Sequence, residues 1–317
     1  MNRREFIKKA GLSVLGASIL PQYVLSQKSK KVIEPNPFRK LEDPTYDGSV
    51  FHTKIKWDNI GEGLDFSRTF VYRNDNLIDI ISAVKINPEN NKIQVFNSYT
   101  PRGVHARNIE NWQKHTGATV MINSAQYMAD PMYMPCAPVI QQGKLIGPRH
   151  NRLTRGMLVS EPKDKNVPLA DLLDFDYDSF DLNNTTYTEG VQHWPIILDR
   201  AGKVKVKRSL WQANRTIVAK DNDKNMLFLT TEGGYFTLFN FGHFLKDSNS
   251  RQDKGYNIHT AMNMDGGYEA NMIVRAPGLE YLTYGSFETY GPGQDYTVFN
   301  TKIPIPGAVG VFPREKR

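Results

Sequence analysis

Apolar and polar residues alternate over several short stretches of the chain, a pattern typical of β-strands. Residues 78–86 follow this pattern, and the turn-forming residues 87–91 then lead into a second apolar stretch at 93–96. This arrangement predicts a β-hairpin. Two further strands are expected at 216–219 and 226–231, on either side of a polar turn.

Helical spacing is confined to isolated segments between the predicted strands. Ile109 and Trp112 lie three positions apart within residues 107–115, and Gly117 follows, as expected for a short helix with a C-terminal glycine. Residues 236–245 can form a second helix. Because strands outnumber helices, the predicted fold class is α+β, with mixed, mostly antiparallel sheets and a few helices in a single domain.

The first 26 residues predict a targeting segment rather than part of the fold. Arg3 and Arg4 form a basic pair, and the uncharged stretch 10–20 is about half as long as a helix that crosses a bilayer. We expect residues 1–26 to be a twin-arginine signal peptide that is cleaved after Ser26. The mature protein would then be periplasmic or extracellular, with the export machinery as a partner and no stable membrane span. An ordinary amphipathic first helix and an uncleaved membrane anchor are the alternatives.

Residues 27–49 predict a linker or a loosely attached arm, because Lys, Pro, Asn and Asp are frequent and no hydrophobic period is present. Ordered structure is expected from Val50, so one domain would extend over residues 50–317. Cys136 is the single cysteine, and therefore no intrachain disulfide can form. In an oxidising compartment the hydrophobic core alone must stabilise this domain.

The charge of the chain argues against nucleic acid as a partner. The formal net charge is +7, but residues 1–26 carry four basic side chains and one acidic side chain, which leaves +4 for the mature chain. No block of like charges is present, so we expect no nucleic-acid binding. The seven histidines are scattered and form no metal-binding pattern. The sequence requires no cofactor, although a Ca²⁺ or Mg²⁺ site built from Asp265, Glu232 and carbonyl oxygens stays open.

Polar residues directly follow several of the predicted strands, at positions where side chains leave the core and can converge on one cleft. Each segment alone has an ordinary explanation, since Asp-Gly-Gly, for example, is more often a tight turn than a site. These residues are Asn123 after the predicted strand 118–122, the pair Asn214–Arg215, Glu232 before two glycines, and Asn263 and Asp265 before Gly266 and Gly267.

In order and spacing, these segments resemble the phosphodiester glycosidase family. The family usually shows a strand ending in Asn-Gly-Gly, a glycine-containing hairpin, an Asn-Pro-Arg-Thr type segment, a strand ending in Asp-Gly and a final Asn-Leu-Asp-Gly-Gly. The resemblance covers residues 118–275, about half of the mature chain. The corresponding segments are 122–125, 143–145, 212–216, 229–233 and 262–267.

Three departures from the family pattern bear on the substrate more than on the fold. Ser124–Ala125 replaces the glycine pair, Glu232 stands where Asp is common, and Tyr268–Glu269–Ala270 replaces a Gly-Ser-Ser type run. The last change lies beside the presumed site. It motivates the alternative of a carbohydrate-binding protein that has the same fold and no catalytic activity.

The resemblance implies a hydrolase, a glycosidase that cleaves a sugar-1-phosphodiester in envelope polymers or scavenged glycans. With the predicted signal peptide, this enzyme is expected to be exported. An N-acetylglucosamine-1-phosphodiester is the model substrate. Arg215 is suited to the phosphate, because a guanidinium offers paired donors and stays protonated. Which bond is broken, carbon to oxygen or phosphorus to oxygen, is left open. A metal-dependent phosphodiesterase is therefore a further alternative.

The resemblance also implies roles for individual residues. Asp265 is the expected base or nucleophile, with Glu232 as its partner and Glu269 in reserve, since glycosidic cleavage usually uses two carboxylates. Amide side chains and backbone N–H groups would bind the phosphate or the sugar hydroxyls. The residues expected to bind substrate are Asn123, Asn214, Asn263, Gly266, Gly267 and Glu269.

Overall fold

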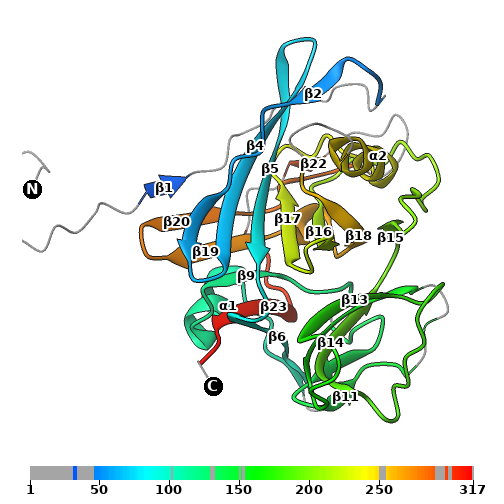
Figure 1. Cartoon of the computed structure of the whole chain (residues 1–317). Coiled ribbons are helices and arrows are strands. Elements are labelled where there is room, and N and C mark those ends of the chain that lie inside the picture. Colours follow the sequence, from blue (N-terminus) through cyan, green and yellow to red (C-terminus); the bar gives the residue numbers. More distant parts are fainter. Residues whose placement is uncertain are drawn as a thin grey trace, which may run out of the picture.

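Antiparallel β-strands are the main secondary structure of the described chain (Figure 1). The computed structural model describes residues 31–33, 46–100, 103–128, 133–149, 151, 154–249, 255–289, 297–298 and 302–315. In these ranges every strand pairing is antiparallel except that of β1 (Lys31–Ile33) with β20 (Leu279–Thr283). The predicted α+β class with mostly antiparallel sheets and few helices is therefore confirmed. The predicted signal peptide lies outside the described residues.

The largest sheet has eight strands and supplies two of the strand ends that reach the site. Its order is β15, β18, β16, β17, β5, β4 and β2, with β3 paired to β4. The strands predicted at 216–219 and 226–231 are confirmed as the antiparallel neighbours β16 and β17. In the order just given, the bounds are Ile196–Leu198, Ile258–Asn263, Thr216–Asp221, Met226–Thr231, Asn76–Ile86, Leu64–Arg73 and Val50–His52, with β3 at Asp58–Gly61.

The predicted hairpin between residues 78–86 and 93–96 is wrong, although both strands exist. β5 pairs with β4 and β17, whereas β6 (Asn91–Asn97) pairs with β23 (Gly307–Pro313) in a second sheet. The turn at 87–91 therefore carries the chain from one sheet to another. Alternation identifies a strand but not its partner, and β5 already has a nearby partner in β4. Asn74 and Asp75 join these two strands, both at positive φ, as tight hairpin turns require.

The second sheet has six strands and the third has five. The six-stranded sheet contains β1, β20, β19, β9, β23 and β6 in that order, so β1 extends it from within the region predicted as an arm. The five-stranded sheet has the order β11, β10, β14, β12 and β13. Two short ribbons pair β7 with β8 and β21 with β22. The remaining bounds are β7 Tyr99–Thr100, β8 Gly103–Val104, β9 Val120–Asn123, β10 Val139–Gln141, β11 Lys144–Ile146, β12 Gly156–Pro162, β13 Ala170–Asp174, β14 Tyr187–His193, β19 Met272–Ala276, β21 Phe287–Glu288 and β22 Thr297–Val298.

The hydrophobic core lies between the three sheets. Met226 and Phe228 of β17 pack in a cluster that draws side chains from all of them. Leu227 and Leu229 point to the opposite face, where they pack with aromatic residues of α2 (Leu238–Asn249). Figure 1 shows α2 lying against β16, β17 and β18. Both faces of the eight-stranded sheet are therefore buried, and the predicted helix near 236–245 provides the outer cover.

The short helix α1 (Ile109–Thr116) covers the six-stranded sheet and confirms the predicted helix. Asn108 caps it by accepting a hydrogen bond from the Asn111 backbone N at 2.9 Å. Gly117 ends it in the left-handed conformation, with φ of 75°. Trp112 anchors it by donating from Nε1 to the Ile305 carbonyl at 2.9 Å. No helix in the described part of the chain is long and apolar enough to span a membrane.

Candidate active site

A cleft of about 500 Å³ opens where the ends of β14 and β18 meet the segment before β16. The sequence hypothesis requires Arg215 and Asp265 to share one pocket, and both line this cleft. Five of the nine predicted site residues do so, namely Arg215, Asn263, Asp265, Gly266 and Glu269. The other lining residues are Gln126, Tyr127, Tyr133, His193, Trp194, Pro195, Trp211, Leu238 and Glu288.

Three carboxylates belong to the cleft: Asp265, Glu269 and Glu288. Asp265 follows β18, Glu269 ends the 3-10 turn η1 (Gly267–Glu269), and Glu288 lies in β21. Burial raises the pKa of Asp265 well above its ordinary value, and the charges of Glu269 and Glu288 raise it further. Burial likewise raises the pKa of Glu269 and of Glu288. Such a cluster can hold one proton and still present a charged carboxylate, so it can supply both an acid and a base.

Arg215 brings a buried positive charge to the cleft. Its side chain donates from Nε to the Phe236 carbonyl at 3.1 Å and from Nη2 to the Trp211 carbonyl at 2.7 Å. Its Nη1 makes no hydrogen bond to any residue that the structure describes, and a Cβ added to Gly266 would lie 3.5 Å from it. Burial lowers the pKa of Arg215 to about 10, which still leaves it charged at neutral pH. The free Nη1 is therefore available to an anion.

Asn123 and Asn214 do not line the cleft but hold its walls in place. Asn123 Nδ2 donates to the Asp265 carbonyl at 2.8 Å, and its Oδ1 accepts from Thr216 Oγ1 at 2.7 Å. Asn214 Oδ1 accepts from the Phe287 backbone N at 2.9 Å, next to Glu288. Both amides are buried and engaged within the protein. They position the segments that carry the carboxylates and do not reach a ligand.

The two glycines after Asp265 allow close backbone approach. The Gly266 N–H donates to Asp265 Oδ1 at 3.1 Å, and the Gly267 N–H donates to the Asn214 carbonyl at 2.8 Å. Neither amide is therefore free to bind an anion, in contrast to the expectation from the sequence. Gly267 adopts φ of 67°, and a Cβ at this position would collide with the Glu288 carboxylate. Only glycine lets the turn pass beneath that side chain.

Glu232, the expected partner of Asp265, is not among the residues of the cleft. Arg68 donates to its two carboxylate oxygens at 2.9 and 2.6 Å. Ser82 and Tyr281 donate to Oε1 at 2.8 and 2.9 Å. The end of β17 was identified correctly, but the Glu232 side chain points away from the cleft and forms a buried ion pair with Arg68. The hypothesis that Glu232 and Asp265 work as a pair is not supported by this placement.

Arg68→Met tests the structural role of this ion pair. The Glu232 side chain is fully buried, so removing its cation leaves a charge without compensation. We expect the free energy of unfolding to fall by about 3 kcal/mol, measured by urea denaturation. Arg155→Met, which removes an exposed ion pair with Asp176, should cost less than about 1 kcal/mol. Equal losses in the two variants would contradict the assignment.

Several residues of the cleft were missed by sequence reasoning. His193 ends β14, and Trp194 and Pro195 directly follow it. This is the same strand-end position that marked other candidates, so the rule could have found these residues. Trp194 and Trp211 are 41% and 60% exposed, which no sequence pattern indicated. Glu288 lies beyond the segments that resemble the family. It follows no long apolar strand, so no signal pointed to it.

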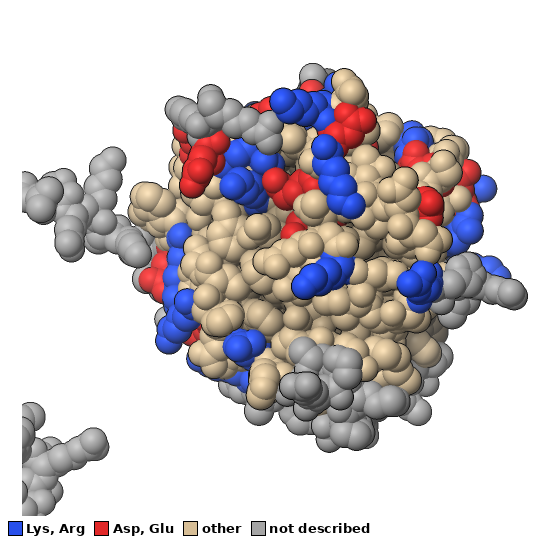
Figure 2. All heavy atoms as spheres, turned by 90° about the horizontal axis from the view of Figure 1, so that it is seen from below, with Lys and Arg blue, Asp and Glu red and all other residues tan. Residues whose placement is uncertain are grey.

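Charge elsewhere on the molecule is mixed. On the face shown in Figure 2, basic and acidic side chains are interspersed, and large areas carry neither. No group of three or more His, Cys, Asp or Glu side chains in the described ranges is arranged to hold a metal ion. The Ca²⁺ or Mg²⁺ site that the sequence left open used Asp265 with Glu232, and Glu232 is engaged with Arg68 instead.

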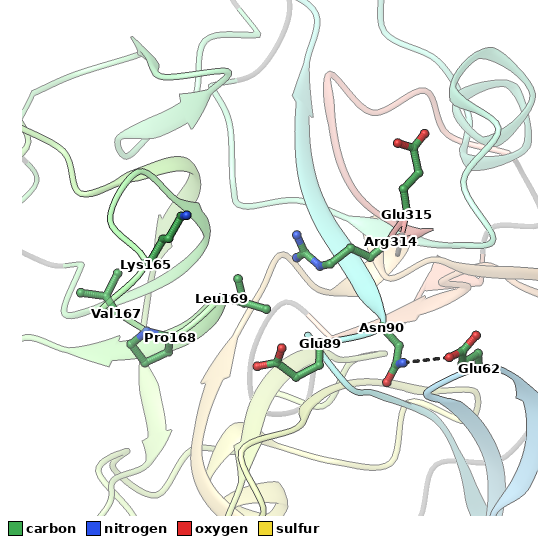
Figure 3. Close-up of a pocket in the computed structure, with 9 residues that line it drawn as sticks. All are labelled: Glu62, Glu89, Asn90, Lys165, Val167, Pro168, Leu169, Arg314 and Glu315. Carbon is green, nitrogen blue, oxygen red and sulfur yellow. Dashed lines mark hydrogen bonds between the residues drawn. The ribbon is translucent and has the colours of Figure 1, made fainter. Parts of the chain in front are cut away.

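A second hollow, of about 340 Å³, shares no residue with the cleft (Figure 3). Arg314 is the only arginine among the described residues that line it, and it donates to both carboxylate oxygens of Glu161 at 2.9 and 2.6 Å. Glu62 accepts from Asn90 at 3.2 Å. This hollow therefore lacks the uncommitted buried guanidinium that distinguishes the cleft.

Comparisons with known proteins bear on this fold and cleft. The model of the phosphodiester glycosidase family matches residues 116–312. A search among curated proteins found no match. The chain is similar to the solved catalytic domain of zebrafish N-acetylglucosamine-1-phosphodiester alpha-N-acetylglucosaminidase, auto-inhibited by pro-peptide. The identity is 15% and the TM-score 0.56, over 84% of this chain and 89% of that one.

Two further solved structures share the fold. A hypothetical protein from Synechocystis is 13% identical with a TM-score of 0.52, over 82% of this chain and 64% of that one. A protein from Burkholderia pseudomallei is 8% identical with a TM-score of 0.54, over 89% of this chain and all of the other. Likeness at such low identity supports the fold alone. The family match spans more than half of the chain and contains all nine predicted site residues, and the chain therefore belongs to the phosphodiester glycosidase family.

Proposed function

We propose that this protein is a glycosidase that hydrolyses a sugar-1-phosphodiester, with N-acetylglucosamine-1-phosphodiester as the model substrate, in envelope polymers or scavenged glycans. One observation carries the proposal: the uncommitted Nη1 of Arg215 shares a cleft with the carboxylates of Asp265, Glu269 and Glu288. A phosphodiester is a monoanion that suits a guanidinium. With the phosphate at Arg215, the neighbouring sugar carbon would face the carboxylates. Membership of the family supports the same class of reaction.

In this proposal the carboxylates divide the work of breaking the bond between the anomeric carbon and the phosphate oxygen. Asp265 acts either as the base that takes a proton from the water attacking the carbon, or as a nucleophile whose glycosyl ester water then hydrolyses. Glu269 supplies a proton to the leaving oxygen. The electron pair leaves with the phosphate, whose charge Arg215 stabilises. The products are a free sugar and a phosphomonoester. Glu232 takes no part, because its carboxylate is bonded to Arg68, Ser82 and Tyr281.

The raised pKa of Asp265 predicts where activity is lost in acid. A base works when deprotonated, so activity falls as the pH drops through this raised pKa, above the range of an ordinary carboxyl near pH 4. The charge of Glu269 contributes to the increase. Glu269→Gln should therefore lower the pKa of Asp265 and move the acid limb of kcat/KM to lower pH. A limb that stays in place or moves to higher pH would show that the two groups do not interact in this way.

Gly285→Ala tests whether the turn after Asp265 must keep its position. A Cβ on Gly285 would collide with the Gly267 carbonyl, so the turn that carries Glu269 has to shift. We expect kcat/KM to fall by about 10²-fold, as for other small displacements of catalytic groups. Gly48→Ala, with no atom within 4 Å of the added carbon, is the control and should retain full activity. Wild-type activity in both variants would mean that the turn tolerates displacement.

A substrate panel tests the proposed function directly. The full-length mature protein is assayed with methyl N-acetylglucosamine-1-phosphate, with p-nitrophenyl N-acetylglucosaminide and with bis-p-nitrophenyl phosphate, each with and without EDTA. The proposal expects hydrolysis of the glycosyl phosphodiester. Cleavage of the sugar-free diester alone, abolished by EDTA, would favour a metal-dependent phosphodiesterase. Sugar binding without any turnover would favour the carbohydrate-binding alternative, which the altered run at residues 268–270 motivates.

We also propose that the protein is exported by the twin-arginine pathway to the periplasm or beyond. The basic pair Arg3–Arg4 before the short uncharged stretch 10–20 supports this proposal. Arg3→Lys combined with Arg4→Lys should retain the chain in the cytoplasm in cell fractionation. Normal export of this double variant would overturn the assignment.

A further inference from the structure

Two buried hydrogen-bond acceptors of the cleft have no partner in the described part of the chain. They are His193 Nε2 and Asn263 Oδ1, and the two residues are only 4% and 7% exposed. Both residues line the cleft. A buried polar atom without a partner costs free energy, so native proteins leave few of them without a structural or functional reason.

The contacts of His193 fix which of its ring nitrogens accepts. Nδ1 lies 2.8 Å from the backbone carbonyl of Asn263, and a carbonyl can only accept. Nδ1 therefore carries the proton. Burial lowers the pKa of His193 to about 4, so the ring is neutral at neutral pH. Nε2 of this tautomer presents a lone pair and requires a donor.

The contacts of Asn263 likewise leave an acceptor atom of its side chain without a partner. Its Nδ2 donates to the Trp194 carbonyl at 3.4 Å, which leaves Oδ1 as the free acceptor. The backbone of Asn263 binds the same segment, since its N–H donates to the Pro195 carbonyl at 3.0 Å. The two acceptors are thus held together by mutual contacts between the β14–β15 link and the end of β18.

From this arrangement we infer that His193 Nε2 and Asn263 Oδ1 together form a subsite that recognises hydrogen-bond donors on the sugar ring, either hydroxyl groups or an acetamido N–H. The inference rests on the proposed function for the identity of the ligand. An ionised phosphodiester has no donor and cannot satisfy two acceptors. The phosphate therefore belongs at Arg215, and the donor-rich sugar belongs at His193 and Asn263.

The exposed indoles fit the same orientation of the ligand. Trp194 follows His193, and the two rings stack with centroids 6.4 Å apart. Trp211 lies next to the guanidinium proposed to bind the phosphate, because its backbone carbonyl accepts from Arg215. Indole faces in a cleft can cover the apolar C–H face of a sugar while its hydroxyls bind polar groups. One indole thus belongs to the acceptor subsite and the other to the phosphate subsite.

Deoxy analogues of the ligand test the subsite. The probes are methyl N-acetylglucosamine-1-phosphate, its 3-, 4- and 6-deoxy derivatives, and the glucose counterpart that lacks the acetamido group. Dissociation constants are measured by tryptophan fluorescence on an Asp265→Asn background, so that no turnover is needed. We expect at least one analogue to bind about 10-fold or more weakly than the parent compound, and His193→Phe to abolish that difference. His193→Gln, which restores an acceptor oxygen, should recover part of it.

The control is His52→Phe. His52 is a buried histidine whose Nδ1 also lies near a backbone carbonyl, that of Thr53 at 2.6 Å, but it does not line the cleft. This variant should keep the full discrimination between parent and analogue.

An equal loss of affinity for all probes in His193→Phe, or no discrimination by the wild type, would overturn the inference. Discrimination without turnover of any probe by the wild type would support the subsite and contradict the proposed function. Turnover by the wild type, together with an equal loss of affinity for all probes in His193→Phe, would support the proposed function and contradict the subsite.

Discussion

Asp265→Asn is expected to lower kcat/KM for a sugar-1-phosphodiester by about 10³-fold. The carboxylate is the group proposed to act at the anomeric carbon, and asparagine retains its shape without its charge or basicity. The Gly266 N–H can still donate to the remaining side-chain oxygen, so the turn should keep its conformation. The rate is measured by release of the free sugar, and folding is checked by circular dichroism.

Asp221→Asn is the matched control for this substitution. Asp221 is a buried aspartate at the end of β16 that also accepts from a nearby backbone N–H, that of Asn225 at 2.7 Å. It lies outside the cleft, so activity should be retained. Wild-type activity in Asp265→Asn would remove the central residue of the proposed site. A similar loss in both variants would indicate a general effect of altering buried carboxylates.

Arg215→Met should have the second largest effect, a loss of about 10²-fold to 10³-fold in kcat/KM for the phosphodiester. Methionine fills much of the buried volume, but it cannot stabilise the charge that develops on the leaving phosphate. The loss should be much smaller for p-nitrophenyl N-acetylglucosaminide, whose leaving group is not a phosphate, if this compound is turned over. Affinity for the methyl phosphodiester, followed by tryptophan fluorescence, should fall with the rate.

Arg275→Met is the control, because Arg275 binds Gln113 and Glu280 at the six-stranded sheet, outside the cleft. It should leave the rate unchanged. An unchanged affinity of Arg215→Met for the phosphodiester would contradict the assignment of Arg215 as the phosphate ligand. Unfolding in urea separates this effect from a loss of the two carbonyl contacts that hold the guanidinium.

The sequence predicted the strand ends that build the cleft, because a polar residue after an apolar strand is visible in one dimension. Asn263 and Asp265 were found in this way. Arg215 was grouped with them, although it precedes β16 and does not follow a strand. The direction of each side chain was not visible. The side chains of Asn123 and Asn214 are buried within the protein. Glu232 forms an ion pair with Arg68 of β4, a residue 164 positions away in the sequence. A buried pair formed over such a separation leaves no local pattern.

Strand pairing failed for a related reason. Residues 78–86 and 93–96 have the alternation of a hairpin, but β5 and β6 enter different sheets, because β5 pairs with the preceding strand β4 whereas β6 pairs with the distant β23. Residues contributed by irregular segments were also missed. Trp211 precedes a strand and Glu288 lies in a two-residue strand, so neither had periodicity to mark it. Positions of this kind are determined by tertiary contacts.

Hydrolysis of methyl N-acetylglucosamine-1-phosphate in ¹⁸O-labelled water tests the central claim most directly. If the carboxylates act at the sugar carbon while Arg215 holds the departing phosphate, mass spectrometry will find the label in the free sugar and none in methyl phosphate. Label in methyl phosphate would mean that water attacks phosphorus, and would contradict the glycosidase mechanism proposed for this cleft.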